Sequence, residues 1–448
     1  MSLYLRSHIS LIHKGGNTDD MGNFRPISLI SVIYKTMSRA ILRRMENTLD
    51  DAVGDSQAGF RNGFSTLDHV HTVKMVIQNS HEYKMPLHLA FVDFAKAFDS
   101  VEWAAVWNSL LMAGINSDIV VLLQRVYRAS KSAVVVNGAL VDIELERGVR
   151  QGDCLSPKLF TSALRMCLDQ VDWSRRGVRV DGSKISLLAF ADDVVLLGRS
   201  KNELVSLLRD LRVAAESIGL KFNARKTKIM STTTTAANSA LVVDGQQYAY
   251  VDSIKYLGCT ISIPLDPRKE ITQRVQAGWG VFSQYKHFLE SAYTPMALKR
   301  KLFDSCVSPA VLYASETWTL TKHVANKLRI SQRKMERRMA GVTLRDRKTN
   351  EWSGGGRLGR QGVSTEGPMG GSDQRHGQKS AGEESHRVDA ARRQAAERET
   401  DDEMARHAGQ DDGHDGILEG KRRRASKRSP HAARHIRKRR RFCDKDKA

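Results

Sequence analysis

The amino-acid sequence predicts an α+β fold, and three observations support this prediction. Short apolar runs bounded by Gly, Pro, Asp or Asn alternate with longer segments in which apolar residues recur at helical spacing. The chain has 448 residues, of which 41% are hydrophobic, so it can bury a substantial core and is long enough for two or three domains. From residue 270 to residue 341 the pattern is helical and basic. We therefore expect an α+β body followed by a helical module.

Apolar spacing gives the helices and the first strand. Residues 26–49 place apolar side chains at helical spacing with basic residues between them, which predicts a helix. Residues 87–94 form a short apolar run after Pro86, which predicts a buried strand. Further helices are expected over residues 101–112, 118–128, 159–171 and 204–218.

Turn residues give the remaining strands. Residues 132–136 and 139–145 flank Asn137-Gly138, which suits the two-residue turn of a β-hairpin. The apolar runs on either side of Ala191-Asp192-Asp193 predict strand, tight turn and strand in the same way. These and later strands are expected over residues 185–190, 194–197 and 241–263, the last with a turn at Asp244-Gly245.

The charge balance favours a polyanionic partner. The chain carries 71 Lys+Arg against 50 Asp+Glu, a formal net charge of +21. Such an excess most often marks a nucleic-acid-binding protein, and the alternative is a solvated basic surface. No apolar run suits a membrane span, no signal-peptide pattern is present, and the five cysteines lack C-x-x-C spacing. We expect an intracellular protein, in nucleus or cytoplasm, without a membrane partner; the oligomeric state stays open.

The last hundred residues differ in composition from the rest. Residues 351–420 are rich in glycine and poor in large apolar side chains, which predicts disorder. Residues 421–448 are rich in Lys and Arg, with clusters at residues 421–424 and 437–441. These clusters have the composition of nuclear-import signals, and the alternative is that they are accidents of a shifted reading frame.

Three carboxylates stand in apolar surroundings. Asp93 lies in the run at residues 87–94, and Asp192-Asp193 lie between two apolar strands. A buried carboxylate is costly unless it is paired or bound to metal. If the strands are neighbours, Asp93 and Asp192 project from one edge as an oxygen-only site that suits Mg²⁺, and two such ions could support in-line phosphoryl transfer. The alternative for Asp192-Asp193 alone is an ordinary hairpin turn.

A loop at residues 148–157 leads into a helix. Gly152 allows the backbone to approach a flat ligand, and Arg150 and Gln151 can donate to phosphates or base edges. Glycine-rich helix entries are common, so this signal is weak by itself. Asp99 is best explained as an acid near a helix N-terminus.

Seven short motifs lie in order between residues 22 and 258. They are GNFRPISL (22–29), SQAGFR (56–61), FVD with FD (91–99), RQG (150–152), FADD (190–193), GLKFN with KTK (219–228) and YLG (256–258). In this order and at these spacings they resemble the reverse transcriptase of non-LTR (LINE-like) retrotransposons. The resemblance spans over half of the chain.

The resemblance implies a right-hand polymerase with palm, thumb and incomplete fingers. Residues 1–265 would form fingers and palm, residues 266–350 a helical thumb-like module, and residues 351–448 a disordered tail. The activity implied is that of an RNA-directed DNA polymerase, which extends a DNA primer 3′-OH with dNTPs on an RNA template. The cofactor implied is Mg²⁺, with Mn²⁺ as the alternative.

The resemblance also assigns roles to the acids and to one aromatic residue. Asp93 and Asp192 would hold the metals, Asp193 would support the site, and the Phe94 carbonyl would be a further ligand. Phe98 would be a steric gate, since a rigid ring below the sugar repels a ribose 2′-OH and so selects deoxynucleotides. The alternative for Phe98 is core packing against the following helix.

Basic and polar residues complete the implied site. Gln151 and Gly152 would line the template–nucleotide pocket, and Lys226 would approach the leaving pyrophosphate. The remaining cations are implied to bind the triphosphate (Lys35, Arg39) or the template and primer (Arg25, Arg150). For Lys226, Lys35, Arg39 and Arg25 a solvated surface position is the alternative.

The chain departs from the family pattern at both ends. It begins at what corresponds to the middle of the fingers, and His13 stands where relatives commonly carry proline. The family pattern stops near residue 350, with no Cys/His knuckle after it. A truncated, frame-shifted copy of an element would produce this change, and comparing the reading frame on either side of codon 350 tests that hypothesis.

Two alternatives to an active reverse transcriptase stay open. One is a catalytically inactive remnant that only binds nucleic acid through its basic surface. The other is an RNA-dependent RNA polymerase with the same palm layout, which predicts a small polar residue in place of Phe98.

Overall fold

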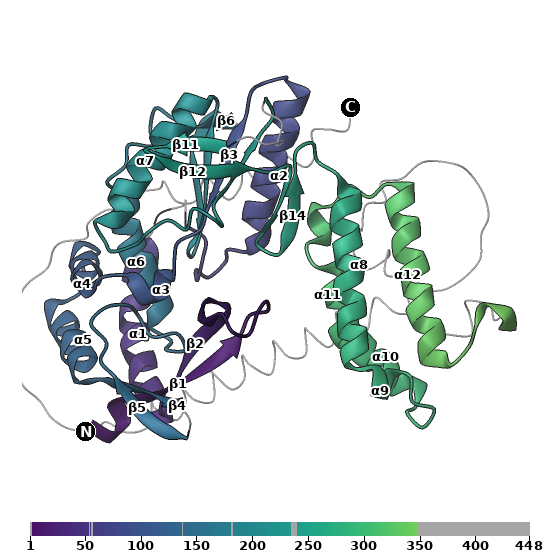
Figure 1. Ribbon diagram of the computed structural model, residues 1–448, viewed down its shortest axis with the longest axis horizontal. Helices are drawn as coiled ribbons and strands as arrows, with labels where there is room; N and C mark the ends of the chain where they lie inside the picture. Colours follow the sequence, from purple (N-terminus) through teal and green to yellow (C-terminus); the bar gives the residue numbers. More distant parts are fainter. Residues whose placement is uncertain are drawn as a thin grey trace, which may run out of the picture. The chain divides into compact units, whose positions relative to one another are not determined.

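The computed structural model describes residues 2–347, apart from residues 53, 55–56, 137, 181 and 234–239. Helices and strands alternate up to Ser262, and helices follow. The predicted α+β class is therefore confirmed (Figure 1). The expectations for residues 351–448, and that for the turn residue Asn137, lie outside the described residues.

A four-stranded sheet forms near the N-terminus, with strand order β2-β1-β4-β5. β1 pairs antiparallel with β2 and parallel with β4, and β4 and β5 form the predicted hairpin. The bounds are Arg6–His13 (β1), Phe24–Leu29 (β2), Lys131–Val136 (β4) and Ala139–Ile143 (β5).

The prediction of one helix over residues 26–49 is wrong at its start. Helix α1 spans Val32–Ala52, whereas residues 26–29 belong to β2. Pro26 and Ile27 pair with Leu11 and Ser10 of β1. The short apolar run fits both the helical and the strand period, and Pro26 is tolerated because β2 is an edge strand.

A six-stranded sheet forms the centre of the body, with strand order β11-β12-β10-β3-β9-β8. The predicted strand at residues 87–94 is β3, and all five of its residues are buried. β3 runs antiparallel to both of its neighbours, β9 and β10. The bounds are His88–Val92 (β3), Leu187–Phe190 (β8), Asp193–Gly198 (β9), Lys228–Ser231 (β10), Ala240–Val243 (β11) and Gln246–Tyr250 (β12).

Helices cover both faces of this sheet, as α7 and α2 do in Figure 1. Ala90 and Val92 of β3 belong to a core with helices α4, α6 and α7, whereas Leu89 and Phe91 belong to a core with α2. This alternation explains why β3 is apolar throughout. The bounds are Ala97–Ser100 (α3), Trp103–Met112 (α4), Ser117–Ala129 (α5), Ser156–Leu168 (α6) and Lys201–Glu216 (α7).

Helix α2 (Thr66–Glu82) was not predicted, although its start carries a sequence signal. The Ser65 side chain accepts from the helix backbone, and the Asp68 carboxylate accepts from Ser65 N at 2.8 Å. This capping box satisfies backbone donors that would otherwise lack partners at the helix start.

Two hairpins complete the body. Strands β13 (Ser253–Tyr256) and β14 (Cys259–Ser262) pair antiparallel around Leu257-Gly258, both at positive φ, and confirm the strand prediction for this region. Strands β6 (Val178–Val180) and β7 (Ser183–Ile185) form the second hairpin.

The helices predicted from residue 270 onward are confirmed. They share a core of their own that includes Ile271, Phe282, Leu328 and Met335. Within the described ranges, no helix is both long and apolar enough to span a membrane. The bounds are Pro267–Gln284 (α8), Lys286–Leu289 (α9), Met296–Leu302 (α10), Ser308–Leu312 (α11) and Lys322–Ala340 (α12).

Candidate active site

The three predicted aspartates lie at one end of the six-stranded sheet. Val92 of β3 pairs with Val194 of β9, so the antiparallel register places Asp93 opposite Asp193. Phe190 pairs with Asp193 across the β8–β9 hairpin, which leaves Ala191-Asp192 as its two-residue turn. Asp93 comes directly after β3 rather than inside it. The fold thus brings together acids that are about a hundred residues apart in sequence.

The turn between β8 and β9 has an unusual backbone. Ala191 has φ +55°, whereas Asp192 does not have a positive φ. A positive φ at the first turn residue alone is the pattern of a type II′ hairpin turn, where glycine is the usual residue. An alanine held in this region stores local strain, which often accompanies a functional site.

The pKa values of Asp93 and Asp193 are raised. Burial raises the pKa of Asp93 and the charge of Asp192 adds to this, while Lys226, a hydrogen bond with Asn223 and Lys14 lower it. The Asp193 side chain keeps contact with solvent, yet its pKa is raised to about 6, first by loss of surrounding water and then by the charges of Asp192 and Asp93. A cation would relieve this repulsion.

The acids fit a divalent cation that shares its coordination with substrate. In the part of the chain that the structure describes, no three Asp, Glu, His or Cys side chains form a ready-made metal site. Mg²⁺, however, is commonly held by one or two carboxylates together with water and substrate phosphates. The oxygen-only donors and the raised pKa values of Asp93 and Asp193 suit such an ion. Phe94, the other predicted ligand, is buried and forms a bridge with Phe222.

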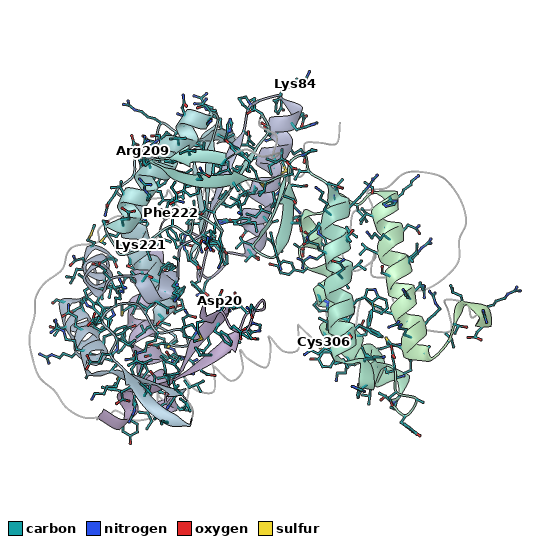
Figure 2. All side chains as sticks on the ribbon, viewed as in Figure 1. Asp20, Lys84, Arg209, Lys221, Phe222 and Cys306 are labelled. Atoms are coloured by element: carbon teal, nitrogen blue, oxygen red, sulfur yellow. The ribbon has the colours of Figure 1, made fainter. Side chains whose placement is uncertain are left out.

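The segment before β10 holds the end of β3 in place. Asn223 N donates to Asp93 O at 2.7 Å, and Asp93 N donates to Thr227 Oγ1 at 3.2 Å. The ring centroid of Phe222 (Figure 2) lies 5.5 Å from that of Phe94. Asn223 and Thr227 had no predicted role, and only their place beside Lys226 in one motif could have indicated it.

Residues of α3, of the RQG loop (150–152) and of β2 form a second group of predicted site residues. Val149 N donates to Phe98 O at 2.7 Å, and Gln151 Nε2 donates to Asp99 Oδ1 at 3.2 Å. Ser28 N of β2 donates to Gln151 O at 2.8 Å. The RQG loop therefore joins α3 to the four-stranded sheet.

Within this loop, Gly152 lies close to β2 and Arg150 is buried. Gly152 has φ +111°, and a Cβ there would lie 2.7 Å from Ser28 O, so the loop approaches β2 closely only because this residue is glycine. Arg150 is only 4% exposed, and its guanidinium lies 5.3 Å from the Tyr34 ring centroid and 5.6 Å from that of Tyr127. In this position Arg150 offers almost no surface to a template or primer.

Phe98 is partly buried between two other aromatic rings. Its centroid is 4.7 Å from that of Phe160, with the rings at 17°, and 6.4 Å from that of Phe60, with the rings at 81°. Stacking on Phe160 fixes the ring orientation, as a steric gate requires, and the same contact is what core packing predicts.

Unlike Arg150, the other predicted cations are exposed. Lys35 and Arg39 lie on the outer face of α1, and Arg25 lies on β2. Lys226 lowers the pKa of Asp93, so it lies close to the acids. Lys14, after β1, lowers the pKa of both Asp93 and Asp99. Its position was not predicted, because no local pattern shows that β1 approaches the end of β3.

The sequence matches known proteins over the same region. The family model described as "Reverse transcriptase (RNA-dependent DNA polymerase)" matches residues 12–261. An uncharacterised transposon-derived protein of Caenorhabditis elegans is 34% identical over 172 residues, covering 37% of this chain and 61% of the relative. The Pol polyprotein of the type-2 retrotransposable element R2DM of Drosophila melanogaster is 27% identical over 270 residues, covering 57% and 25%.

Further relatives include an RNA-directed DNA polymerase from the mobile element jockey of Drosophila melanogaster, 26% identical, which covers 75% of this chain and 37% of the relative. The chain thus spans between 25% and 61% of the length of these relatives. Among solved structures, telomerase of Candida albicans with a telomeric RNA fragment has a TM-score of 0.49 at 11% identity, covering 78% of this chain and 66% of that one. Apo telomerase of Candida tropicalis has a TM-score of 0.45 at 15% identity, covering 76% and 64%.

The family model covers more than half of the chain and includes the segments that carry Asp93 and Asp192-Asp193. The relatives confirm the predicted resemblance to the polymerases of non-LTR retrotransposons. The chain belongs to the reverse transcriptase (RNA-dependent DNA polymerase) family.

Proposed function

We propose that this chain is an RNA-directed DNA polymerase of a non-LTR retrotransposon, which extends a DNA primer with dNTPs on an RNA template. The observation that carries the proposal is the position of Asp93, Asp192 and Asp193 at one end of the central sheet, where burial and the neighbouring carboxylates raise the pKa of Asp93 and of Asp193. This arrangement lies inside the region matched by the reverse transcriptase family. The segments that hold the acids would form the palm, and the helices from Pro267 the thumb.

The roles of the residues follow from their positions. Asp93, Asp192 and Asp193 would hold Mg²⁺, or Mn²⁺ in its place, with the Phe94 carbonyl as a further ligand. When bound, the metal supplies charge neutralisation at the attacking 3′-oxygen and at the triphosphate. Lys226, beside Asp93, would stabilise negative charge on the leaving pyrophosphate.

The remaining residues would bind and orient the substrates. Gln151 and Gly152, next to Asp99 and Ser28, would line the template–nucleotide pocket. Exposed cations of the N-terminal segment would contact the triphosphate or the template: Lys14, Arg25, Lys35 and Arg39. Arg150 is left out of this set because it is buried.

Primer extension on poly(rA)/oligo(dT) with Mg²⁺ tests the proposal. We expect the parent chain to incorporate dTTP and Asp192→Ala to lose incorporation by at least about 100-fold, because the remaining acids cannot replace a lost metal ligand. Asp118→Ala, which removes an exposed aspartate of α5, is the control and should keep parental activity. Equal incorporation by Asp192→Ala and parent would reject the assignment. Binding of the hybrid without incorporation by the parent would favour the inactive remnant.

Sugar selection separates DNA from RNA synthesis. If Phe98 is the gate, Phe98→Ala removes the ring that repels the 2′-OH, and rUTP incorporation relative to dTTP should rise by about tenfold or more. Single-nucleotide extension with each substrate measures this ratio. Because Phe98 stacks on Phe160, thermal unfolding of the same variant reports any loss of core packing separately. A folded variant with unchanged selectivity would contradict the gate.

A further inference from the structure

One side chain binds both backbone polar groups of the strained turn residue Ala191. Ala191 N donates to Gln57 Oε1 at 2.8 Å, and Gln57 Nε2 donates to Ala191 O at 3.1 Å. Gln57 is only 1% exposed. The side-chain amide thus pairs with Ala191 as a neighbouring strand would, at a place where the hairpin ladder has ended.

The pairing coincides with an unfavourable conformation. Ala191 has φ +55°, which is disfavoured for any residue with a Cβ, and it is the residue directly before Asp192. Such a conformation persists only when surrounding contacts hold the residue in it. The two hydrogen bonds from Gln57 supply contacts of this kind, and both their donors and acceptors are buried.

Gln57 is itself fixed against the edge strand β8. It forms a parallel bridge with Ala189, and Ala58 N donates to Ala189 O at 2.9 Å. Its Oε1 also accepts from Gly59 N at 2.8 Å. Arg61 Nη1 donates to Gln57 O at 3.2 Å. The amide therefore has little freedom to move away from the turn.

Residues 57–59 can approach the turn at Ala191 only because residue 59 is glycine. A Cβ at Gly59 would lie 2.2 Å from Ala191 N and 2.9 Å from Ala191 Cα. These atoms are backbone and cannot rotate away, so only glycine lets residues 57–59 lie directly against the turn. The contact is therefore built into the sequence of both segments.

We infer that Gln57 is a positioning residue, which sets the direction of Asp192 and Asp193 by holding Ala191 in its strained conformation. The inference rests on the proposed function, because the orientation of these acids matters for polymerisation only if they hold the metals. Gln57 is buried and acts through the turn. It should therefore affect the rate of the chemical step more than the affinity for dNTP.

Steady-state primer extension with Gln57→Met, Ala191→Gly and the double variant tests the inference. Met has nearly the volume of Gln but forms neither hydrogen bond, so Gln57→Met should lower kcat by about 10- to 100-fold, with KM for dTTP changed by less than about threefold. Glycine adopts positive φ without help, so Ala191→Gly in the Gln57→Met background should restore most of the lost kcat. Gln332→Met, which replaces another buried glutamine, in α12, should keep parental kcat.

Unfolding in urea of the parent, Gln57→Met, Ala191→Gly and the double variant gives a readout that needs no activity. The Gln57→Met change should lower the unfolding midpoint in the parent. It should lower the midpoint less in the Ala191→Gly background, because a glycine at residue 191 depends less on the two hydrogen bonds from Gln57. If the parent polymerises but Gln57→Met keeps its kcat, or if Ala191→Gly restores neither kcat nor stability, the positioning role is overturned. A parent without activity rejects the proposed function instead, and the coupling in unfolding then still decides whether Gln57 holds the turn.

Discussion

Single residues of the site are held in surroundings that disfavour their charge. Asp193 is the clearest case, since its pKa is raised to about 6 from 3.8. The folded metal-free protein therefore holds this proton more tightly than the unfolded chain does. It follows that stability falls as the pH rises from about 4 to about 6, where Asp193 loses its proton in the folded state.

The pH dependence of Asp193→Asn tests this reasoning. In EDTA at about pH 8, the variant should have a higher Tm than the parent, because Asn removes a charge that Asp192 and Asp93 repel. Below about pH 4, where the parent carboxyl is protonated in both states, the difference should vanish. Differential scanning calorimetry across this range measures it, with Asp118→Asn as the control. A parent that is more stable than Asp193→Asn at about pH 8 in EDTA would show that the acids do not repel one another.

The site residues that could be predicted are those that differ in polarity from their neighbours in the sequence. Asp93 and Asp192-Asp193 were identifiable because each acid interrupts an apolar run. Gln57 and Lys14 were not, because their importance arises from contacts with segments far away in the chain. The burial of Arg150 could not be predicted for the same reason, since it depends on the rings of Tyr34 and Tyr127.

Local pattern predicted most elements and the pairing within hairpins, but not the pairing between strands that are distant in sequence. The hairpins and the helices of the body stand out because turn residues and helical spacing act over a few residues. β1 was missed because its residues are mostly exposed and show no apolar period, and β2 was taken for helix. β1 pairs with β2 and with the distant strand β4, and β2 pairs only with β1, so these strands are defined by their partners rather than by their own local pattern.

Helix α8 offers a matched pair of glycines for testing how the helical module packs. A Cβ at Gly278 would lie 2.2 Å from Val311 Cγ2 of α11, whereas a Cβ at Gly280 would meet no atom within 4 Å. Gly278→Ala should therefore destabilise the protein by about 1–3 kcal/mol through overpacking. Gly280→Ala should stabilise it by about 0.5–1 kcal/mol, because alanine favours the helix more than glycine does.

Chemical denaturation of both variants measures this difference. The substitution is the same, on the same helix and two residues apart, so helix propensity alone predicts equal gains. A stabilising Gly278→Ala would mean that α8 and α11 do not pack as closely as the structure has them. A destabilising Gly280→Ala would mean that this face of α8 is covered.

The whole described region is joined by contacts between body and helical module. Tyr313 Oη donates to Leu257 O at 2.9 Å, and Lys74 Nζ donates to Thr317 Oγ1 at 2.8 Å. The order of body and module was predictable from the change in apolar pattern at residue 270. The contacts that join them were not, because they depend on how the β13–β14 hairpin meets α2 and the end of α11.

The net charge of +21 leads to a prediction about the whole molecule. On α12, the exposed Lys334 and Arg338 lie over the Trp279 ring, with their charged groups 5.7 Å and 5.2 Å from its centroid. If the helical module follows the backbone of a primer–template duplex, these cations contact phosphates. Affinity for an RNA–DNA hybrid should then fall steeply with salt, with a slope of about 0.9 in the logarithmic plot for each phosphate contact.

Fluorescence anisotropy at several salt concentrations measures this slope. The double variant Lys334→Ala, Arg338→Ala should reduce its magnitude by about 2, one unit for each lost phosphate contact. The double variant Arg209→Ala, Arg212→Ala also removes two positive charges, but both arginines lie on α7, outside the helical module, and bind Asp244 (Arg209 is labelled in Figure 2). Arg338 also pairs with an acid, Glu290 at 3.7 Å, so the two pairs differ in their place in the fold, and the slope of the α7 variant should stay near the parental one. Equal reductions by both pairs would show that net charge alone attracts the duplex, and that α12 has no particular part in binding it.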